Sequence, residues 1–154
     1  MPDSDQPRVL ILGGTAEAAG LARSLADGYG DKLAVTTSLA GRTRAPDPVP
    51  GQVRSGGFGG AGALADYLKD RRIAAVVDAT HPFAAQISAN AAAACEIAGV
   101  PRLVLSRPGW LPQASDNWVE FDSVEAAARG LSRFGRRAFL TIGVQELSAF
   151  TALA

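Results

Sequence analysis

The residues with the clearest chemical use form the turn Gly13-Gly14-Thr15, which follows the apolar run 8–12 and precedes an alanine-rich segment. This order predicts a strand, a tight turn and the start of a helix. The first turn of a helix has unpaired N–H groups and a partial positive charge, and glycine lets a ligand approach the backbone. We interpret the turn as a phosphate-binding site. Because the spacing departs from the GxGxxG fingerprint, a plain structural turn is the alternative.

A second group of candidate residues lies where a predicted strand at 32–37 ends. Ser38, Gly41 and Arg42 form its exit loop, and this loop contains no acidic residue. In dinucleotide folds a carboxylate at this place binds the ribose of NAD, whereas an arginine suits the 2′-phosphate of NADP. The loop therefore favours NADPH as the cofactor, with a solvated arginine as the alternative.

His81 is the only histidine, and it follows the apolar run 73–79. The carboxyl ends of such strands form the ligand-binding edge of open α/β sheets. Imidazole can transfer protons near neutral pH, which makes His81 a candidate acid, but contact with substrate or a structural role in the turn fits equally well. Cys95 has no base beside it and is expected to be a packed core thiol. No catalytic triad, metal cluster or carboxylate pair stands out, so the catalytic residue is left unassigned and no metal is expected.

Strands and helices alternate along most of the chain and must position these residues. Apolar residues recur at helical spacing after the glycine turn, and apolar runs of strand length alternate with further helical segments. The alternation predicts the α/β class, as a Rossmann-like doubly wound parallel sheet. The predicted strands are 8–12, 32–37, 52–55, 73–79 and 102–106, and the later predicted helices are 61–71 and 82–98.

The composition limits the classes of function. The 154 residues include 15 basic and 15 acidic side chains, and this balance gives no electrostatic footprint for nucleic acid or an anionic membrane. One cysteine excludes an intrachain disulfide. No apolar run approaches the roughly 18 residues of a membrane span, and the first residues do not resemble a signal peptide. We therefore expect a cytoplasmic protein that acts on a small molecule, and its oligomeric state is left open.

The composition changes after Pro108, and this change suggests a domain organisation. Residues 1–7 are expected to be a disordered tail and 8–112 a Rossmann-like NADP-binding domain. Residues 113–154 are expected to be a linker and the beginning of an incomplete second α/β domain, with strands at 118–121 and 138–142. Asp122 is the predicted cap of the helix between them. Two strands and one helix cannot enclose a core. Either residues 118–154 add to the first sheet or the chain is a fragment of a longer two-domain protein, and we favour the fragment.

Four motifs in order resemble the signatures of the precorrin-6A reductase family of cobalamin biosynthesis. The most specific is the string Asp-Ala-Thr-His-Pro-Phe-Ala at 78–84. The others are the string from Leu10 to Ala18, the loop Gly56-Gly57-Phe58-Gly59-Gly60 and Gln145-Glu146-Leu147. Val144 departs from the family pattern, in which a polar or basic residue often precedes the glutamine.

The resemblance implies NADPH-dependent reduction of one double bond in the precorrin-6A macrocycle, giving precorrin-6B. It implies two Rossmann-like domains with the cofactor and the tetrapyrrole between them. Gly13, Gly14 and Thr15 would then hold the pyrophosphate, Ser38 and Arg42 the adenosine end, and His81 and Phe83 would face the substrate. Two alternatives stay open: a cobalt-precorrin-6A reductase of the anaerobic route, and a non-catalytic NADP-binding regulatory module.

Overall fold

The computed structural model describes residues 6–41, 48–109 and 111–153. The chain divides into two compact units, Met1–Pro108 and Gly109–Ala154, and each is described by itself. The sequence places the boundary slightly later, after residue 112. Within the described residues, no helix is both long enough and apolar enough to cross a bilayer.

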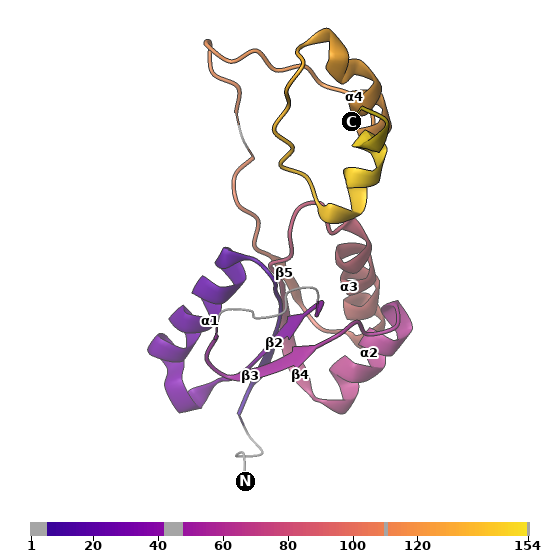
Figure 1. Ribbon diagram of the computed structural model, residues 1–154. Helices are drawn as coiled ribbons and strands as arrows, with labels where there is room; N and C mark the ends of the chain where they lie inside the picture. The colour runs from indigo at the N-terminus through magenta and orange to yellow at the C-terminus, as the bar shows by residue number, and fades with distance from the viewer. Residues whose placement is uncertain (1–5, 42–47, 110, 154) are drawn as a thin grey trace. The chain divides into compact units, whose positions relative to one another are not determined.

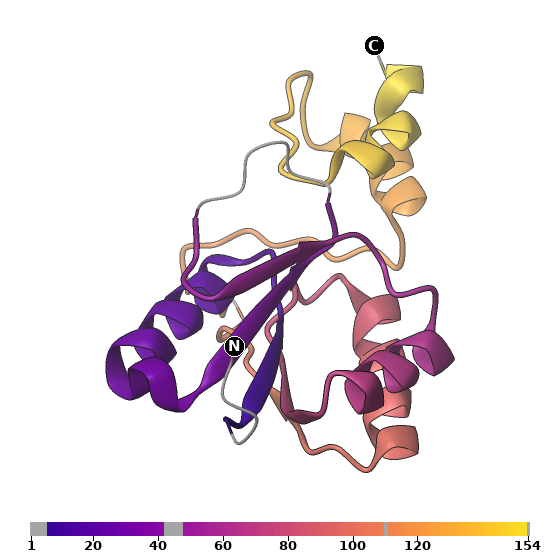
Figure 2. The same cartoon turned by 90° about the horizontal axis from the view of Figure 1, so that it is seen from below.

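The first unit is built on one parallel sheet, visible edge-on in Figure 2. The strand order is β3-β2-β1-β4-β5, and every neighbouring pair is parallel. This order confirms the predicted Rossmann-like doubly wound α/β class. The strands are β1 (Arg8–Leu12), β2 (Ala34–Leu39), β3 (Gln52–Ser55), β4 (Ile73–Asp78) and β5 (Arg102–Val104).

Helices cover both faces of this sheet, as Figures 1 and 2 show. Ile11 of β1 packs in a cluster with Ala18 and Ala22 of helix α1 (Ala16–Tyr29). Leu10 and Leu12 point to the opposite face, because successive side chains of a strand alternate, and pack with α2 (Ala61–Asp70) and α3 (Ala85–Ala98). These three β1 side chains are almost fully buried, and each contributes about 1.5 to 3 kcal/mol.

Several predicted boundaries are wrong, and one of them is the end of β5, which stops at Val104 and not at residue 106. Residues Gly30–Lys32 form a short 3-10 helix, so β2 begins at Ala34 and runs to Leu39. Ser38 therefore lies inside the strand, in register with Leu12, and not in the exit loop. Helix α3 begins at Ala85 because the preceding residues form a turn, in which the Ala84 N–H donates to the carbonyl oxygen of His81 at 2.8 Å.

The ordered backbone begins before β1. The Ala34 N–H donates to the carbonyl oxygen of Pro7 at 2.9 Å. Pro7, expected within the disordered tail, is thus held against β2, whereas residues 1–5 of that tail lie outside the described residues.

The second unit contains α4 (Val124–Gly130) and the 3-10 helices η2 (Leu131–Arg133) and η3 (Val144–Leu153). Ser123, one residue after the predicted Asp122, is the N-cap of α4 and accepts from the Ala126 N–H at 3.1 Å. The described residues of this unit contain no strand, so the strands predicted at 118–121 and 138–142 are wrong. A strand needs a neighbour for its backbone hydrogen bonds, and neither segment has one.

Cys95 lies in α3 and is only 4% exposed, within the cluster formed with α2. Burial raises the pKa of the Cys95 thiol, and the charge of nearby Arg102 opposes this only in part. We expect a disulfide reagent at pH 8 to modify Cys95 roughly 100-fold more slowly in the native protein than in urea, since about 3 kcal/mol of opening free energy gives that factor. The rate is measured from the absorbance of the thiol released by the reagent. Equal rates of modification in buffer and in urea would contradict a packed thiol.

Candidate functional site

The two glycines of the turn after β1 serve different purposes. The Gly13 N–H donates to the Ser38 carbonyl oxygen at 2.9 Å, and a Cβ on Gly13 would lie 3.0 Å from Thr37 Cγ2. Gly13 thus lets β1 and β2 approach closely. Gly14 has a φ of +109°, and a Cβ there would meet no atom within 4 Å. Gly14 therefore supplies the unusual backbone conformation and leaves an open face beside the start of α1.

Thr15 connects this turn to β4. Its Oγ1 accepts from the Ala18 N–H at 3.1 Å as the N-cap of α1, and it donates to the Ala79 carbonyl oxygen at 2.7 Å. The single hydroxyl proton is therefore used inside the protein. Within the described residues, the N–H groups of Thr15, Ala16 and Glu17 have no acceptor. The donors for a phosphate at this turn are backbone groups, not the Thr15 side chain.

A buried hydroxyl lies beneath the same turn. Thr37 is 1% exposed and is a close neighbour of Gly13. Its Oγ1 has no hydrogen-bond partner among the described residues. A buried hydroxyl without a partner costs about 1 to 3 kcal/mol, so this group requires an explanation.

Ser38 is fastened to Arg54, a residue of β3 that the sequence does not single out. Arg54 Nη1 donates to Ser38 Oγ and to the Gly56 carbonyl oxygen, both at 2.9 Å. Arg54 Nη2 donates to the Gly57 carbonyl oxygen at 3.2 Å. The guanidinium carbon lies 3.8 Å from the centre of the Phe58 ring. One arginine therefore links the end of β2 to the glycine-rich loop.

The loop after β2 reaches the same glycine-rich segment. The Gly56 N–H donates to the Leu39 carbonyl oxygen at 2.9 Å. Gly41 has a φ of +75°, and a Cβ there would lie 3.6 Å from the Gly56 nitrogen. Arg42, the predicted partner of a 2′-phosphate, lies outside the described residues.

Asp78 organises the segment that contains His81. This carboxylate is 2% exposed and ends β4. Its Oδ1 accepts from the Thr80 hydroxyl at 2.7 Å and from the Thr80 N–H at 3.3 Å, and its Oδ2 lies 3.1 Å from Arg102 Nη1. The Thr80 hydroxyl also lies 3.1 Å from Ser88 Oγ of α3. The buried carboxylate therefore fixes the backbone immediately before His81.

His81 and Phe83 are both exposed and lie beside each other, with ring centres 5.1 Å apart. Arg107 Nη2 lies 3.0 Å from His81 Nε2, and the Phe83 N–H donates to His81 Nδ1 at 3.2 Å. A neutral imidazole accepts at only one nitrogen, and an imidazolium at neither. The geometry thus places the Arg107 guanidinium and the Phe83 N–H on the two ring nitrogens of His81.

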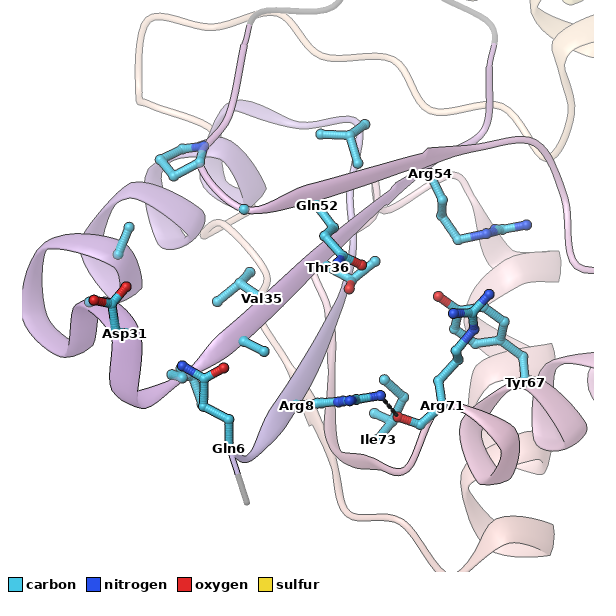
Figure 3. A pocket seen from close by; sticks show the side chains of 17 residues that line it. Gln6, Arg8, Asp31, Val35, Thr36, Gln52, Arg54, Tyr67, Arg71 and Ile73 are labelled. Carbon is cyan, nitrogen blue, oxygen red and sulfur yellow. Dashed lines mark hydrogen bonds between the residues drawn. The ribbon is translucent and has the colours of Figure 1, made fainter. Parts of the chain in front are cut away.

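A separate groove of about 710 Å³ runs along β2 and β3, with Asp31 near the end of α1 and with Tyr67 and Arg71 near the end of α2 in its lining (Figure 3). Arg8, Arg71 and Tyr67 line it, with Arg54 at one end. Gly14, His81 and Phe83 do not belong to its lining. We therefore place the candidate site not in this groove but at the carboxyl ends of the strands. No cluster of three or more potential metal ligands occurs among the described residues.

Sequence reasoning missed Arg54, Arg102 and Arg107. Arg54 precedes the glycine-rich loop by two residues, and this closeness in sequence could have marked it as a residue that holds the loop. The ion pair of Arg102 with Asp78 and the contact of Arg107 with His81 join residues far apart in the chain, and only the strand order brings them together.

Comparison with known proteins identifies relatives along almost the whole chain. The family model described as "Precorrin-6x reductase CbiJ/CobK" matches residues 8–154. Precorrin-6A reductase of Sinorhizobium sp is 51% identical over 146 residues, which cover 95% of this chain and 55% of the relative. Precorrin-6A reductase of Rhodococcus erythropolis is 49% identical over 146 residues, which cover 95% of this chain and 58% of the relative.

A solved structure titled "CobK precorrin-6A reductase" aligns with a TM-score of 0.88 and 46% identity, covering 96% of this chain and 57% of that one. The chain therefore spans little more than half the length of these relatives.

Proposed function

The chain belongs to the precorrin-6x reductase family, and from this premise we propose that it carries the NADPH-binding part of a precorrin-6A reductase. The proposed reaction reduces one double bond of the precorrin-6A macrocycle to give precorrin-6B, in the cytoplasm, as a step of cobalamin biosynthesis. Residues 8–112 would bind NADPH, and 113–154 would link to and begin a second α/β domain. The observation that carries the proposal is the match at about half identity to reductases of this name.

The residues at the carboxyl edge of β1 and β2 fit a dinucleotide. Gly14 leaves an open face beside the N–H groups of Thr15, Ala16 and Glu17, which suits a pyrophosphate. The Thr37 hydroxyl beneath the turn is a buried polar group without a partner among the described residues, which supports a polar ligand site at this turn. Ser38 lies at the end of β2 and Gly41 just after it, where this fold contacts the adenosine ribose, and Arg42 follows them in the sequence.

NADPH, when bound, supplies the hydride, so the protein needs no nucleophile of its own. The residues of this chain bind and orient. The backbone around Gly14 would hold the pyrophosphate, and the segment after β4 would present His81 and Phe83 to the tetrapyrrole. Because Arg107 and the Phe83 N–H both face the imidazole, we propose that His81 contacts the substrate rather than donating a proton.

Replacing Arg107 by alanine is expected to raise KM for precorrin-6A about tenfold and to leave the affinity for NADPH unchanged. Arg107 has no carboxylate partner among the described residues and lies beside His81, so its guanidinium offers a charged donor to an acidic substrate group. Losing one charge-assisted hydrogen bond of about 1.5 kcal/mol gives this factor. Steady-state kinetics with the exposed Arg133→Ala variant as the control provide the measurement. A fall in kcat with KM unchanged would contradict a binding role.

The reaction itself is tested by following the loss of reduced-nicotinamide absorbance when precorrin-6A is added to the protein with NADPH. Precorrin-6B formed in equal amount, identified by mass spectrometry, is the expected result. A parallel reaction with cobalt-precorrin-6A tests the anaerobic alternative. Tight NADPH binding with no turnover of either substrate, by the longest product of the gene, would instead favour a nucleotide-binding regulatory module.

A further inference from the structure

The hydroxyl of Ser38 has a defined hydrogen-bonding direction. A serine hydroxyl has one proton and two lone pairs, and a guanidinium can only donate. Arg54 Nη1 donates to Ser38 Oγ at 2.9 Å, so a lone pair of Ser38 is used. Within the described residues the Ser38 proton has no acceptor, although the residue is only 6% exposed. Ser38 is therefore a donor, and a group that meets it must be an acceptor.

The positive charge of Arg54 is fixed but not neutralised. Its partners are the Ser38 hydroxyl and the carbonyl oxygens of Gly56 and Gly57, and no carboxylate of the described residues pairs with it. The Phe58 ring lies 3.8 Å from the guanidinium carbon, and Phe58 itself packs edge-on against Tyr67 with ring centres 5.2 Å apart. A half-buried cation held this firmly attracts an anion without losing further side-chain entropy.

Ser38 and Arg54 lie where a dinucleotide-binding fold contacts the adenosine ribose. Ser38 is in register with Leu12 of β1 on one side and with Arg54 of β3 on the other, directly beside the turn at Gly13. In folds of this type, the end of the second strand meets the adenosine ribose, whose 2′-substituent distinguishes NADPH from NADH. The 2′-phosphate is an anion with only acceptor oxygens at neutral pH, which matches a donor hydroxyl beside a fixed cation.

We propose that Arg54 is a positioning residue that sets the preference for NADPH over NADH. It holds the Ser38 hydroxyl as a donor toward the 2′-phosphate and places a positive charge behind it. The ligand class is thus an adenosine ribose that carries a phosphomonoester. This inference rests on the proposed NADPH site and assigns the recognition of its phosphate to Ser38 of β2 and Arg54 of β3.

The test compares dissociation constants of NADPH and NADH for wild type and Arg54→Gln, measured by nicotinamide fluorescence. We expect NADPH binding to weaken about 10- to 100-fold, the factor for one charge-assisted hydrogen bond, and NADH binding to weaken less than about threefold. Titration with 2′,5′-ADP and 5′-AMP, followed by calorimetry, should show the same difference. Arg54→Lys keeps the charge and is expected to restore part of the preference.

Arg71→Gln is the matched control, because Arg71 lies 5.9 Å from the Tyr67 ring but makes no contact with Ser38. The ratio of NADPH affinity to NADH affinity in Arg71→Gln should equal that of wild type. Ser38→Ala should lower this ratio of affinities. The double variant Ser38→Ala/Arg54→Gln should lower it by a factor smaller than the product of the two single-variant factors.

Two results would overturn the assignment while leaving the proposed function intact. One is an equal loss of NADPH and NADH affinity in Arg54→Gln. The other is a ratio of NADPH to NADH affinity equal to that of wild type in both Arg54→Lys and Ser38→Ala. Wild-type protein that binds neither nucleotide would overturn the proposed function and this inference together. Wild-type protein that prefers NADH would remove the 2′-phosphate from the site.

Discussion

Replacing Gly14 by valine is expected to weaken NADPH binding at least about 100-fold. The φ of +109° at Gly14 strains any side chain, by about 1 to 3 kcal/mol for a residue forced into a rare backbone region. The two methyl groups would also project into the open face beside Thr15 and Ala16, where the pyrophosphate is proposed to lie. Two displaced charge-assisted hydrogen bonds of about 1.5 kcal/mol each correspond to the expected factor.

The matched control is Gly20→Ala, which changes a glycine within α1 that also has no atom within 4 Å of a Cβ position. Because Gly20 is helical, alanine should raise the free energy of unfolding by about 0.5 to 1 kcal/mol and leave NADPH binding unchanged. Urea unfolding and fluorescence titration of both variants separate stability from binding. Unchanged NADPH affinity in a folded Gly14→Val protein would show that the cofactor does not use this turn.

Replacing Asp78 by alanine is expected to lower the free energy of unfolding by about 3 kcal/mol, the low end for breaking a buried ion pair. The carboxylate is 2% exposed, but the Arg102 side chain is 27% exposed and can regain some hydration. The same change removes Asp78 Oδ1, which accepts from both the N–H and the hydroxyl of Thr80, so the backbone before His81 loses its anchor. We therefore expect weaker substrate binding as well as lower stability.

Urea unfolding of Asp78→Ala, Asp78→Asn and Asp66→Ala provides the measurement. Asp66 is exposed on α2, so its removal should change the free energy of unfolding by less than about 0.5 kcal/mol. Asp78→Asn keeps the Thr80 contacts but loses the charge facing Arg102, and should lie between the other two. A loss below about 1 kcal/mol in Asp78→Ala would contradict a structural role for the pair.

The sheet and its helices could be predicted because local patterns determine them. The apolar run of β1 is buried on both faces, and the glycine turn with its Thr15 cap marks where the strand gives way to α1. The end of β2 was less predictable. Ser38 belongs to the strand because it pairs with Leu12, and such pairing depends on a neighbour far away in sequence.

The candidate site was predictable only where its residues are consecutive. Gly13 to Thr15 and His81 to Phe83 are short strings, whereas Arg54, Arg102 and Arg107 acquire their partners through the order of the strands. In the second unit, the strand predictions were wrong because a local pattern was present without a partner for it. The segments 118–121 and 138–142 have strand-like sequences, but a strand forms only against a neighbour, and among the described residues no strand pairs with them.

The hydrogen bond from the Thr15 hydroxyl to the Ala79 carbonyl oxygen has a thermodynamic consequence. It joins the start of α1 to the backbone two residues before His81. One hydrogen bond therefore links the turn proposed to bind the cofactor to the segment proposed to bind the substrate. If one ligand changes the affinity for the other, linkage requires that the reverse effect be equal in size. We therefore expect Thr15→Val, which loses this bond, to reduce any difference in NADPH affinity measured with and without the macrocycle.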